Sequence, residues 1–552
     1  MISHLSYKGA VCRQSVRWIY ALGGIVLAGY VWHCLAVNYV VDDSFITFRY
    51  VKNFVHGGGL TYNIGERVEG YTNFLWAMLL SVCIWSYPEA NLLHISQVLG
   101  IIFGTATILL VVQFSWRLHR RVSVFGLIGG AFLAMHSAFV AWSTSGLETI
   151  FFTFLVFAGS FAYVCALSTG KLLPVGAALF GLAALTRPEG LLFFAVASAH
   201  LLVSAVRSER PYHSRHILGW FLAFIALYVP YYVWRFTYYG YPLPNTFYTK
   251  VSTGLWQYLR GVRYVLEHLW LYGPCVFLLP LPLLFKKPWE SWRALFFLQV
   301  GVYAVYVVYV GGDGLPFFRF IVPIIPLLYI LVQEGFIEIY GWGKRYLAPQ
   351  DEWKIALPAL LLLGVLLGFT GRHSLMSLLF PNANRWREPQ SELTFPGTGH
   401  DHTYLWFDNY FVDRLTVAAR WLEDNAPPNA VVAATPAGAI AYYMHLPVID
   451  MLGLNDVHIA HTTSLTHGKG RAGHDKGDGK YVLSRSPDYI LLGNVAVLPR
   501  PLSEAEMAQK LVLKSEHEIW AEPDFHDRYE HVSVKLSDQG VFQYFTFYKK
   551  KR

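Results

Sequence analysis

Long apolar runs fill most of the first 371 residues of this 552-residue chain and are separated by short polar segments. A helix needs about 20 consecutive apolar residues to cross the hydrocarbon core of a bilayer, and a soluble core does not need such runs one after another. Only 14% of the residues are charged, against about 25% in ordinary soluble domains. The pattern predicts a polytopic α-helical membrane protein.

Eleven spanning helices are expected from these runs. They are placed at about 18–39, 93–116, 124–141, 149–168, 172–186, 190–206, 216–234, 265–285, 293–310, 320–337 and 354–371. The segment 73–87 is short and rich in aromatic residues, so it is expected to lie along the membrane interface. Basic residues precede the first run and no small-residue cleavage site follows it, which indicates a retained signal anchor.

The basic residues predict an orientation. With the N-terminus in the cytoplasm, the segments that face inward carry most of the Lys and Arg, as the positive-inside rule requires. An odd number of spans then places the C-terminal end outside. The same segments account for the net charge of +8. Nucleic acid is not an expected partner, because no zinc-finger spacing, basic helix or RNA-binding aromatic motif accompanies that charge.

Residues 372–552 have the composition of a soluble domain, so the chain is expected to divide into a membrane module at 1–371 and an outer domain at 372–552. The outer domain is expected to contain a helix at 413–425, strands at 430–434, 446–450 and 487–492, and a loop at 467–480. This order is typical of an α/β layer. None of the five cysteines lies in this domain, which is therefore expected to fold without disulfides.

Two adjacent carboxylates, Asp42 and Asp43, stand immediately beyond the first predicted helix. Ionisable groups near the membrane are costly unless water, a partner or a metal compensates for them. One interpretation is a reactive or ligand-binding pair. The other is a solvated start of the next helix, since Asp is favoured at helix N-termini. Spacing alone leaves both interpretations open.

The other outer loops are short and unusually polar. Their charged, amide and phenol side chains are those of Glu148, Arg187, Glu189, Asn245, Tyr248, Lys250, Asp313 and Arg319. Gathered on one face of the membrane, they suit an anionic, hydroxyl-rich ligand, because Arg and Lys bind phosphate while carboxylates and amides bind sugar hydroxyls. A transporter would instead need charges aligned in the middle of its spans.

The loop sequences resemble those of a known superfamily. The pattern DDSFITFRYVKNFVHGGGLTYNIGERVEGYTNFLW, followed by SGLET, LTRPEG, YYGYPLPNTFYTK, GGDGLPFFRF and VIDMLGLNDVHIA, is similar to the GT-C glycosyltransferases that use polyprenyl-phosphate sugars. Within that superfamily the chain looks most like the terminal β-arabinofuranosyltransferases of mycobacterial cell-wall assembly. The resemblance runs from about Asp42 to Pro487. It implies a GT-C-like membrane module with a periplasmic α/β domain in a bacterial inner membrane.

The resemblance also implies roles for residues. Asp42 or Asp43 would be the general base, and Asp42 matches the usual position in the motif best. Phosphate or donor contacts are expected from Arg49, Arg187, Lys250 and Arg319. Sugar or acceptor contacts are expected from Glu148, Glu189, Asn245, Tyr248 and Asp313, and from Asp450, Asn455 and Asp456 in the outer domain. The one cofactor considered is a divalent cation (Mg²⁺, Mn²⁺ or Ca²⁺) at Asp42, Asp43 or Glu148; no organic cofactor is expected.

The expected reaction moves a sugar, D-arabinofuranose by the resemblance, from a polyprenyl phosphate to an acceptor hydroxyl. A carboxylate takes the hydroxyl proton and a single displacement inverts the anomeric carbon. The lipid tail of the donor stays in the membrane. The acceptor is left open between a glycan, a lipopolysaccharide and a protein. The alternatives are transfer of mannose or aminoarabinose, and a transporter of lipid-linked sugar.

Overall fold

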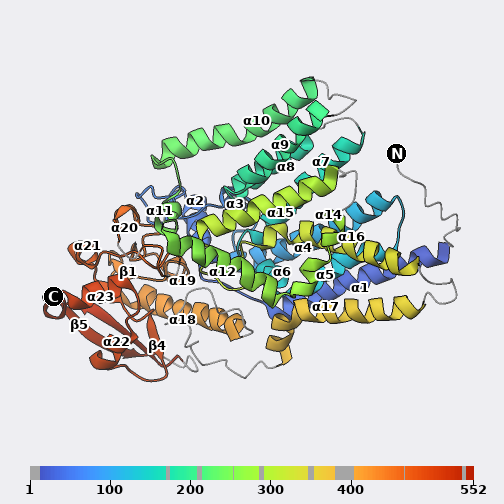
Figure 1. Ribbon diagram of the computed structural model, residues 1–552. Helices are drawn as coiled ribbons and strands as arrows, with labels where there is room; N and C mark the ends of the chain where they lie inside the picture. The colour runs from blue at the N-terminus through green and yellow to red at the C-terminus, as the bar shows by residue number, and fades with distance from the viewer. Residues whose placement is uncertain are drawn as a thin grey trace.

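A computed structural model describes residues 13–169, 174–207, 214–252, 254–284, 291–345, 353–379, 403–464, 467–470, 472–536 and 542–551. A long helical bundle carries a smaller domain with a β-sheet at one end (Figure 1). The arrangement confirms the predicted fold class, a polytopic helical protein with a C-terminal α/β domain.

The bundle is built from helices that follow the apolar runs. They are α1 (Arg13–Val37), α2 (Asp43–Val55), α3 (Phe74–Ser86), α4 (Leu92–His119), η1 (Val124–Leu127), α5 (Ile128–Met135), α6 (Ser137–Thr144), α7 (Thr149–Thr169), α8 (Val175–Thr186), α9 (Gly190–Arg207), α10 (Ser214–Tyr239), α11 (Asn245–Lys250), α12 (Leu255–Leu271), α13 (Pro274–Leu278), α14 (Leu281–Leu284), α15 (Ser291–Val310), η2 (Val322–Ile324), α16 (Ile325–Lys344) and α17 (Trp353–Leu379). In the described residues, seven helices are long and apolar enough to span a membrane, or nine if two bent pairs each count as one.

The remaining expected spans are shorter or broken. The helices at 175–186 and 190–206 belong to the shorter apolar class, as does α3. The expected span at 124–141 bends by 59° between α5 and α6. The break has a local cause: the His136 side chain accepts N–H groups of Ala138 and Phe139 and so caps α6. Hydropathy alone does not reveal such a cap.

The C-terminal domain contains α18 (Thr403–Asn425), β1 (Val432–Ala434), α19 (Ala439–Tyr442), β2 (Val448–Asp450), α20 (Val457–His461), α21 (Gly479–Ser484), β3 (Tyr489–Leu491), β4 (Ala496–Leu498), α22 (Glu504–Lys510), α23 (Lys514–Ala521), α24 (Phe525–Arg528), β5 (Tyr529–Lys535) and β6 (Tyr544–Lys550). The sheet order is β2-β1-β3-β6-β4, and β5 also pairs with β6. Strands β2, β1 and β3 are parallel, whereas β6 runs antiparallel to its neighbours. The three predicted strands are present, each shorter than expected.

Helix α17 runs on to Leu379, past the expected boundary at 371. The expected helix at 413–425 is the second half of α18. The described part of the 467–480 segment has no regular structure before α21 begins at Gly479.

Candidate active site

A cavity of about 540 Å³ lies where one end of the helical bundle meets the C-terminal domain. The bundle supplies most of its wall, through α2, α9, α11 and α15, the segment before α3, and the loops that follow α6, α8, α10 and α15. Leu454 and Ala472 of the C-terminal domain complete it. Seven of the predicted residues line this cavity: Asp43, Glu148, Arg187, Glu189, Lys250, Asp313 and Arg319.

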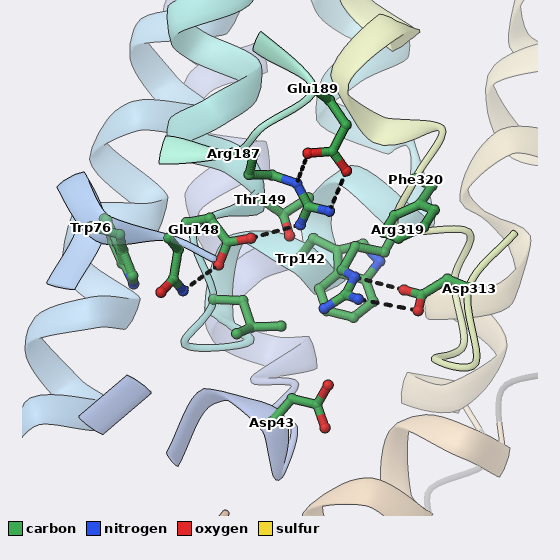
Figure 2. Close-up of polar contacts among 12 residues, drawn as sticks. Asp43, Trp76, Trp142, Glu148, Thr149, Arg187, Glu189, Asp313, Arg319 and Phe320 are labelled. Atoms are coloured by element: carbon green, nitrogen blue, oxygen red, sulfur yellow. Dashed lines mark hydrogen bonds and ion pairs between the residues drawn. The ribbon is translucent and has the colours of Figure 1, made fainter. Parts of the chain in front are cut away.

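Arg187 joins two carboxylates in the cavity wall. Its Nη1 lies 2.7 Å from Glu148 Oε1, and its Nη2 lies 2.9 Å from Glu189 Oε1. Figure 2 shows the guanidinium between the two acids. Burial alone would raise the pKa of the Glu189 carboxyl. The charge and hydrogen bonds of Arg187 have the larger effect, so the pKa is lowered. Arg187 therefore favours the charged form of Glu189.

Arg319 forms a second buried ion pair in the cavity wall, and its guanidinium shares the Phe320 ring with that of Arg187. Its Nε lies 2.6 Å from Asp313 Oδ2, and its Nη2 donates to Asp313 Oδ1 at 3.1 Å. The guanidinium also stands over the rings of Trp142 and Phe320, at 5.7 and 5.3 Å. This fork geometry fixes both the arginine and the carboxylate in place.

Asp43 and Lys250 are held more loosely than these pairs. Asp43 Oδ2 lies 3.9 Å from Lys250 Nζ, and the two side chains are 28% and 29% exposed. No contact drawn in Figure 2 reaches Asp43, which stands apart from the ion pairs. A carboxylate and an ammonium group are thus available in the cavity beside a fixed set of paired charges.

Asp42 points elsewhere, although it is the adjacent residue. Its Oδ1 accepts the Ala439 N–H at 2.7 Å and its Oδ2 accepts the Gly438 N–H at 3.2 Å. It makes no side-chain bond to the start of α2, so the simple helix-cap interpretation is not what the structure shows. Burial, together with the nearby Asp43 charge, raises the pKa of Asp42 to about 7, although the two N–H groups act in the opposite direction.

The backbone approach at this contact requires glycine. A Cβ on Gly438 would lie 2.0 Å from the Asp42 carbonyl oxygen. The Asp42 contact therefore joins the membrane module to the start of α19 and does not face the cavity.

Arg49, predicted to bind phosphate, also contacts the C-terminal domain. Its guanidinium donates to the carbonyl oxygens of Ala441 at 3.0 Å, Met444 at 2.6 Å and Leu446 at 3.3 Å. The Ala441 carbonyl lies in α19 and the other two follow it, so Asp42 and Arg49 hold the two ends of one short helix; we call this the α2–α19 contact. The guanidinium of Arg49 is thus occupied at the domain junction, outside the cavity, and its binding of phosphate stays a prediction.

Five further predicted residues lie outside the cavity wall. Asn245 donates to the carbonyls of Gly453, Leu454 and Asp456. The Tyr248 ring packs on His461, at 4.2 Å between centroids. The other three organise the turn after β2: Asp450 accepts from the backbone and side-chain nitrogens of Asn455, Asn455 accepts from Tyr50, and Asp456 caps α20. These side chains shape the junction and do not enter the cavity.

The predicted metal ligands do not converge. Both Asp42 oxygens accept backbone N–H groups, and the Glu148 oxygens are taken by Arg187 and Asn73. Within the described ranges, no three His, Cys, Asp or Glu side chains are grouped so that they could hold a metal ion. The donor set therefore does not fit a carboxylate-bound divalent cation, and no catalytic step below uses one.

Two further polar residues of the cavity, Asn73 and Tyr306, are not predicted from the sequence. Asn73 Nδ2 donates to Glu148 Oε2 at 2.6 Å and holds that acid from the side opposite Arg187. Its position in the quoted GYTNF stretch was the available signal. Tyr306 hydrogen-bonds Glu189 and lines the cavity from near the C-terminal end of α15, an apolar helix in which the sequence gives no such signal.

Comparisons with known proteins agree with this arrangement. A terminal β-(1→2)-arabinofuranosyltransferase of Mycobacterium tuberculosis is 26% identical over 550 positions, covering 83% of this chain and 84% of the relative. The enzyme of the same name from Corynebacterium glutamicum is 27% identical over 362 positions, covering 56% of this chain and 51% of the relative. A family model described as a domain of unknown function (DUF8728) matches residues 408–548.

Solved structures share the fold. ArnT from Cupriavidus metallidurans bound to undecaprenyl phosphate superposes with a TM-score of 0.54 at 11% identity, covering 97% of this chain and 98% of that one. The apo form gives 0.55 at 13% identity, covering 97% of each chain. The chain therefore shares the fold of ArnT and is similar in sequence to terminal arabinofuranosyltransferases, in agreement with the resemblance that the loop motifs carry.

Proposed function

We propose that this protein transfers a sugar, D-arabinofuranose, from a polyprenyl phosphate to an acceptor hydroxyl on the outer face of the bacterial inner membrane. The observation that carries the proposal is the placement of Asp43, held only by a long contact of 3.9 Å to Lys250, in a cavity walled by two arginine–carboxylate pairs. The relatives named for terminal β-(1→2)-arabinofuranosyl transfer support the choice of sugar.

Asp43 is the proposed general base. The acceptor oxygen forms a bond to the anomeric carbon while Asp43 takes the hydroxyl proton. The bond from that carbon to the phosphate oxygen breaks, and the lipid phosphate leaves with the electron pair. Attack from the side opposite the leaving group inverts the anomeric carbon.

Lys250 is the proposed partner of the departing phosphate. Its ammonium group is 29% exposed and 3.9 Å from its nearest acid, whereas Arg187 and Arg319 hold carboxylates within 3 Å. A cation already neutralised by a short ion pair has less attraction left for a new anion. Charge that develops on the phosphate is therefore stabilised mainly by Lys250, and the two arginines add longer-range attraction.

Glu148, Glu189 and Asp313 are proposed to accept hydroxyl groups of the donor sugar. Each is buried and paired with an arginine. Because their positions do not depend on the ligand, they select a sugar whose hydroxyls meet them in one orientation. The proposed acceptor is a cell-envelope glycan, with lipopolysaccharide and protein as the alternatives.

The test is sugar transfer by the purified protein in detergent. Donors are polyprenyl phosphates carrying arabinofuranose, mannose or aminoarabinose, and acceptors are an arabinan oligosaccharide, lipopolysaccharide and a protein. Wild type should use the arabinofuranose donor, and Asp43→Asn should lower the rate by about 10²–10⁴-fold.

Asp42→Asn is the matched control, because its amide oxygen still accepts one backbone N–H. It should remain within about tenfold of wild type, a loss of about 1.4 kcal/mol or less in transition-state stabilisation. Loss of activity in Asp42→Asn but not in Asp43→Asn would reverse the assignment of the base. No transfer from any donor by folded wild-type protein would reject the proposed function.

A further inference from the structure

A second hollow, of about 550 Å³, lies in the flank of the bundle between α4, α7 and α8. Its walls are apolar except for Gln113 and Arg117 on α4 and the Cys165 thiol on α7. The volume is within the range of about 300–1,000 Å³ that ligand pockets show. None of its lining residues belongs to the cavity described above.

Small side chains create the hollow. Ala158 and Ala162 lie one turn apart on α7, and Ala106 faces them from α4. Residues four apart share one face of a helix. The small side chains of Ala158 and Ala162 therefore leave a continuous groove along α7. Leu109, which borders it, is 51% exposed, as expected for a surface covered by lipid.

The groove ends at an unneutralised cation. Gln113 and Arg117 are one turn apart on the same face of α4 and are both exposed. Among the ion pairs of the described residues none includes Arg117. An exposed Arg at the end of an apolar span attracts an anionic group at the level of the lipid head groups.

The length of the groove matches one leaflet. Ala106 and Arg117 are separated by about 16 Å along α4, at 1.5 Å per residue. Half of a hydrocarbon core of about 30 Å is about 15 Å. Helix α4 begins beside the active-site end of the bundle and Arg117 lies near its other end, so the groove belongs to the leaflet remote from the C-terminal domain (Figure 1).

We infer that this groove binds one anionic phospholipid of the leaflet remote from the C-terminal domain. An acyl chain lies over Ala106, Ala158 and Ala162, and the phosphate is bound by Arg117 with Gln113 as a second donor. The basic residue at the end of the groove selects an anionic head group over a zwitterionic one. The inference does not depend on the proposed transfer reaction.

The test is lipid binding to the purified full-length protein, followed by native mass spectrometry. The probes are phosphatidylglycerol and phosphatidylcholine with the same acyl chains. Wild type should bind phosphatidylglycerol about fivefold more tightly, the factor expected from one basic residue at the membrane surface. Arg117→Gln should remove that preference. Arg120→Gln, which changes a basic residue at the same end outside the groove, should keep it.

A second variant tests the groove itself. Ala158→Phe fills the hollow and should weaken binding of both lipids, while Ala106 and Arg117 remain unchanged. Retention of native unfolding temperature in lipid-free detergent shows that each variant is folded. Equal affinity of wild type for the two lipids, or an unchanged preference in Arg117→Gln, would overturn the inference.

Discussion

At the scale of single residues, Arg187 is expected to stabilise the cavity wall through its two ion pairs. It neutralises Glu148 and Glu189, both of which are buried. Arg187→Met should destabilise the protein by about 3–5 kcal/mol, because two buried carboxylates lose their counter-charge. Denaturant unfolding in detergent measures the change. Arg187→Lys keeps a cation and should lose less; equal stability of wild type and Arg187→Met would show that the pairs are not structural.

Lys250 should matter little for stability but strongly for the rate of transfer. Because it is 29% exposed and 3.9 Å from Asp43, Lys250→Met should cost less than about 1 kcal/mol of stability. Transfer should nevertheless fall by about 10²–10³-fold, as for loss of one group that stabilises charge in a transition state. Rates with saturating donor, measured beside the unfolding curve, separate the two effects. A stability loss equal to that of Arg187→Met would contradict the proposed role.

The sequence predicted the charged residues that line the cavity but not the different roles of two neighbouring residues. Asp42 and Asp43 are adjacent in the chain, yet consecutive helical residues point about 100° apart. Which of them faces the cavity depends on where the C-terminal domain docks, and that contact joins Asp42 to a glycine almost 400 positions later. Arg49 was assigned to phosphate for the same reason: its carbonyl partners are distant in sequence.

At the scale of elements, the α2–α19 contact should depend on pH. The pKa of Asp42 in the folded protein, about 7, is above the unfolded value of about 3.9. The folded state therefore holds the proton more tightly. The stability that this group contributes is fully present below about pH 4 and is lost as pH rises through about 7. The pKa of Asp450, raised by burial to about 6, adds to the effect in the same direction.

Hydrogen exchange at the Gly438 and Ala439 amides tests this prediction. After correction for the intrinsic pH dependence of exchange, protection should fall between pH 5 and pH 8. In Asp42→Asn the change should be smaller, because the remaining amide does not titrate. Amides in the middle of α18 serve as a reference. Protection that is constant with pH in wild type would contradict the predicted titration.

The elements themselves were largely predictable, because apolar runs and the alternation of helix and strand are local properties. The bend at His136 was not, since it depends on a side chain that caps the following helix. The end of the expected span at 172–186 was predictable, because the turn at Arg187-Pro188-Glu189 ends α8 at Thr186.

At the scale of the whole molecule, we propose that the N-terminus is cytoplasmic and the C-terminal domain is periplasmic. Basic residues such as Arg117, Arg120 and Arg121 gather at the bundle end remote from that domain. Alkaline phosphatase fused after Lys551 should be active in bacterial cells, and fused after Arg121 it should be inactive. A fluorescent protein that matures only in the cytoplasm should give the reverse pattern. The opposite result at both sites would invert the orientation.

The closure of the cavity by Leu454 and Ala472 has a consequence for biosynthesis. The acids and bases of the site lie between positions 43 and 319, whereas the segment around 467–472 leaves the ribosome much later. That segment is joined to the bundle by hydrogen bonds from Arg260 to Gly470 and between His467 and Thr249. A nascent chain thus carries every proposed reactive group while its pocket is still open to water. The cavity is then complete only when the C-terminal domain has docked on the bundle, which is later than the insertion of the bundle helices into the membrane.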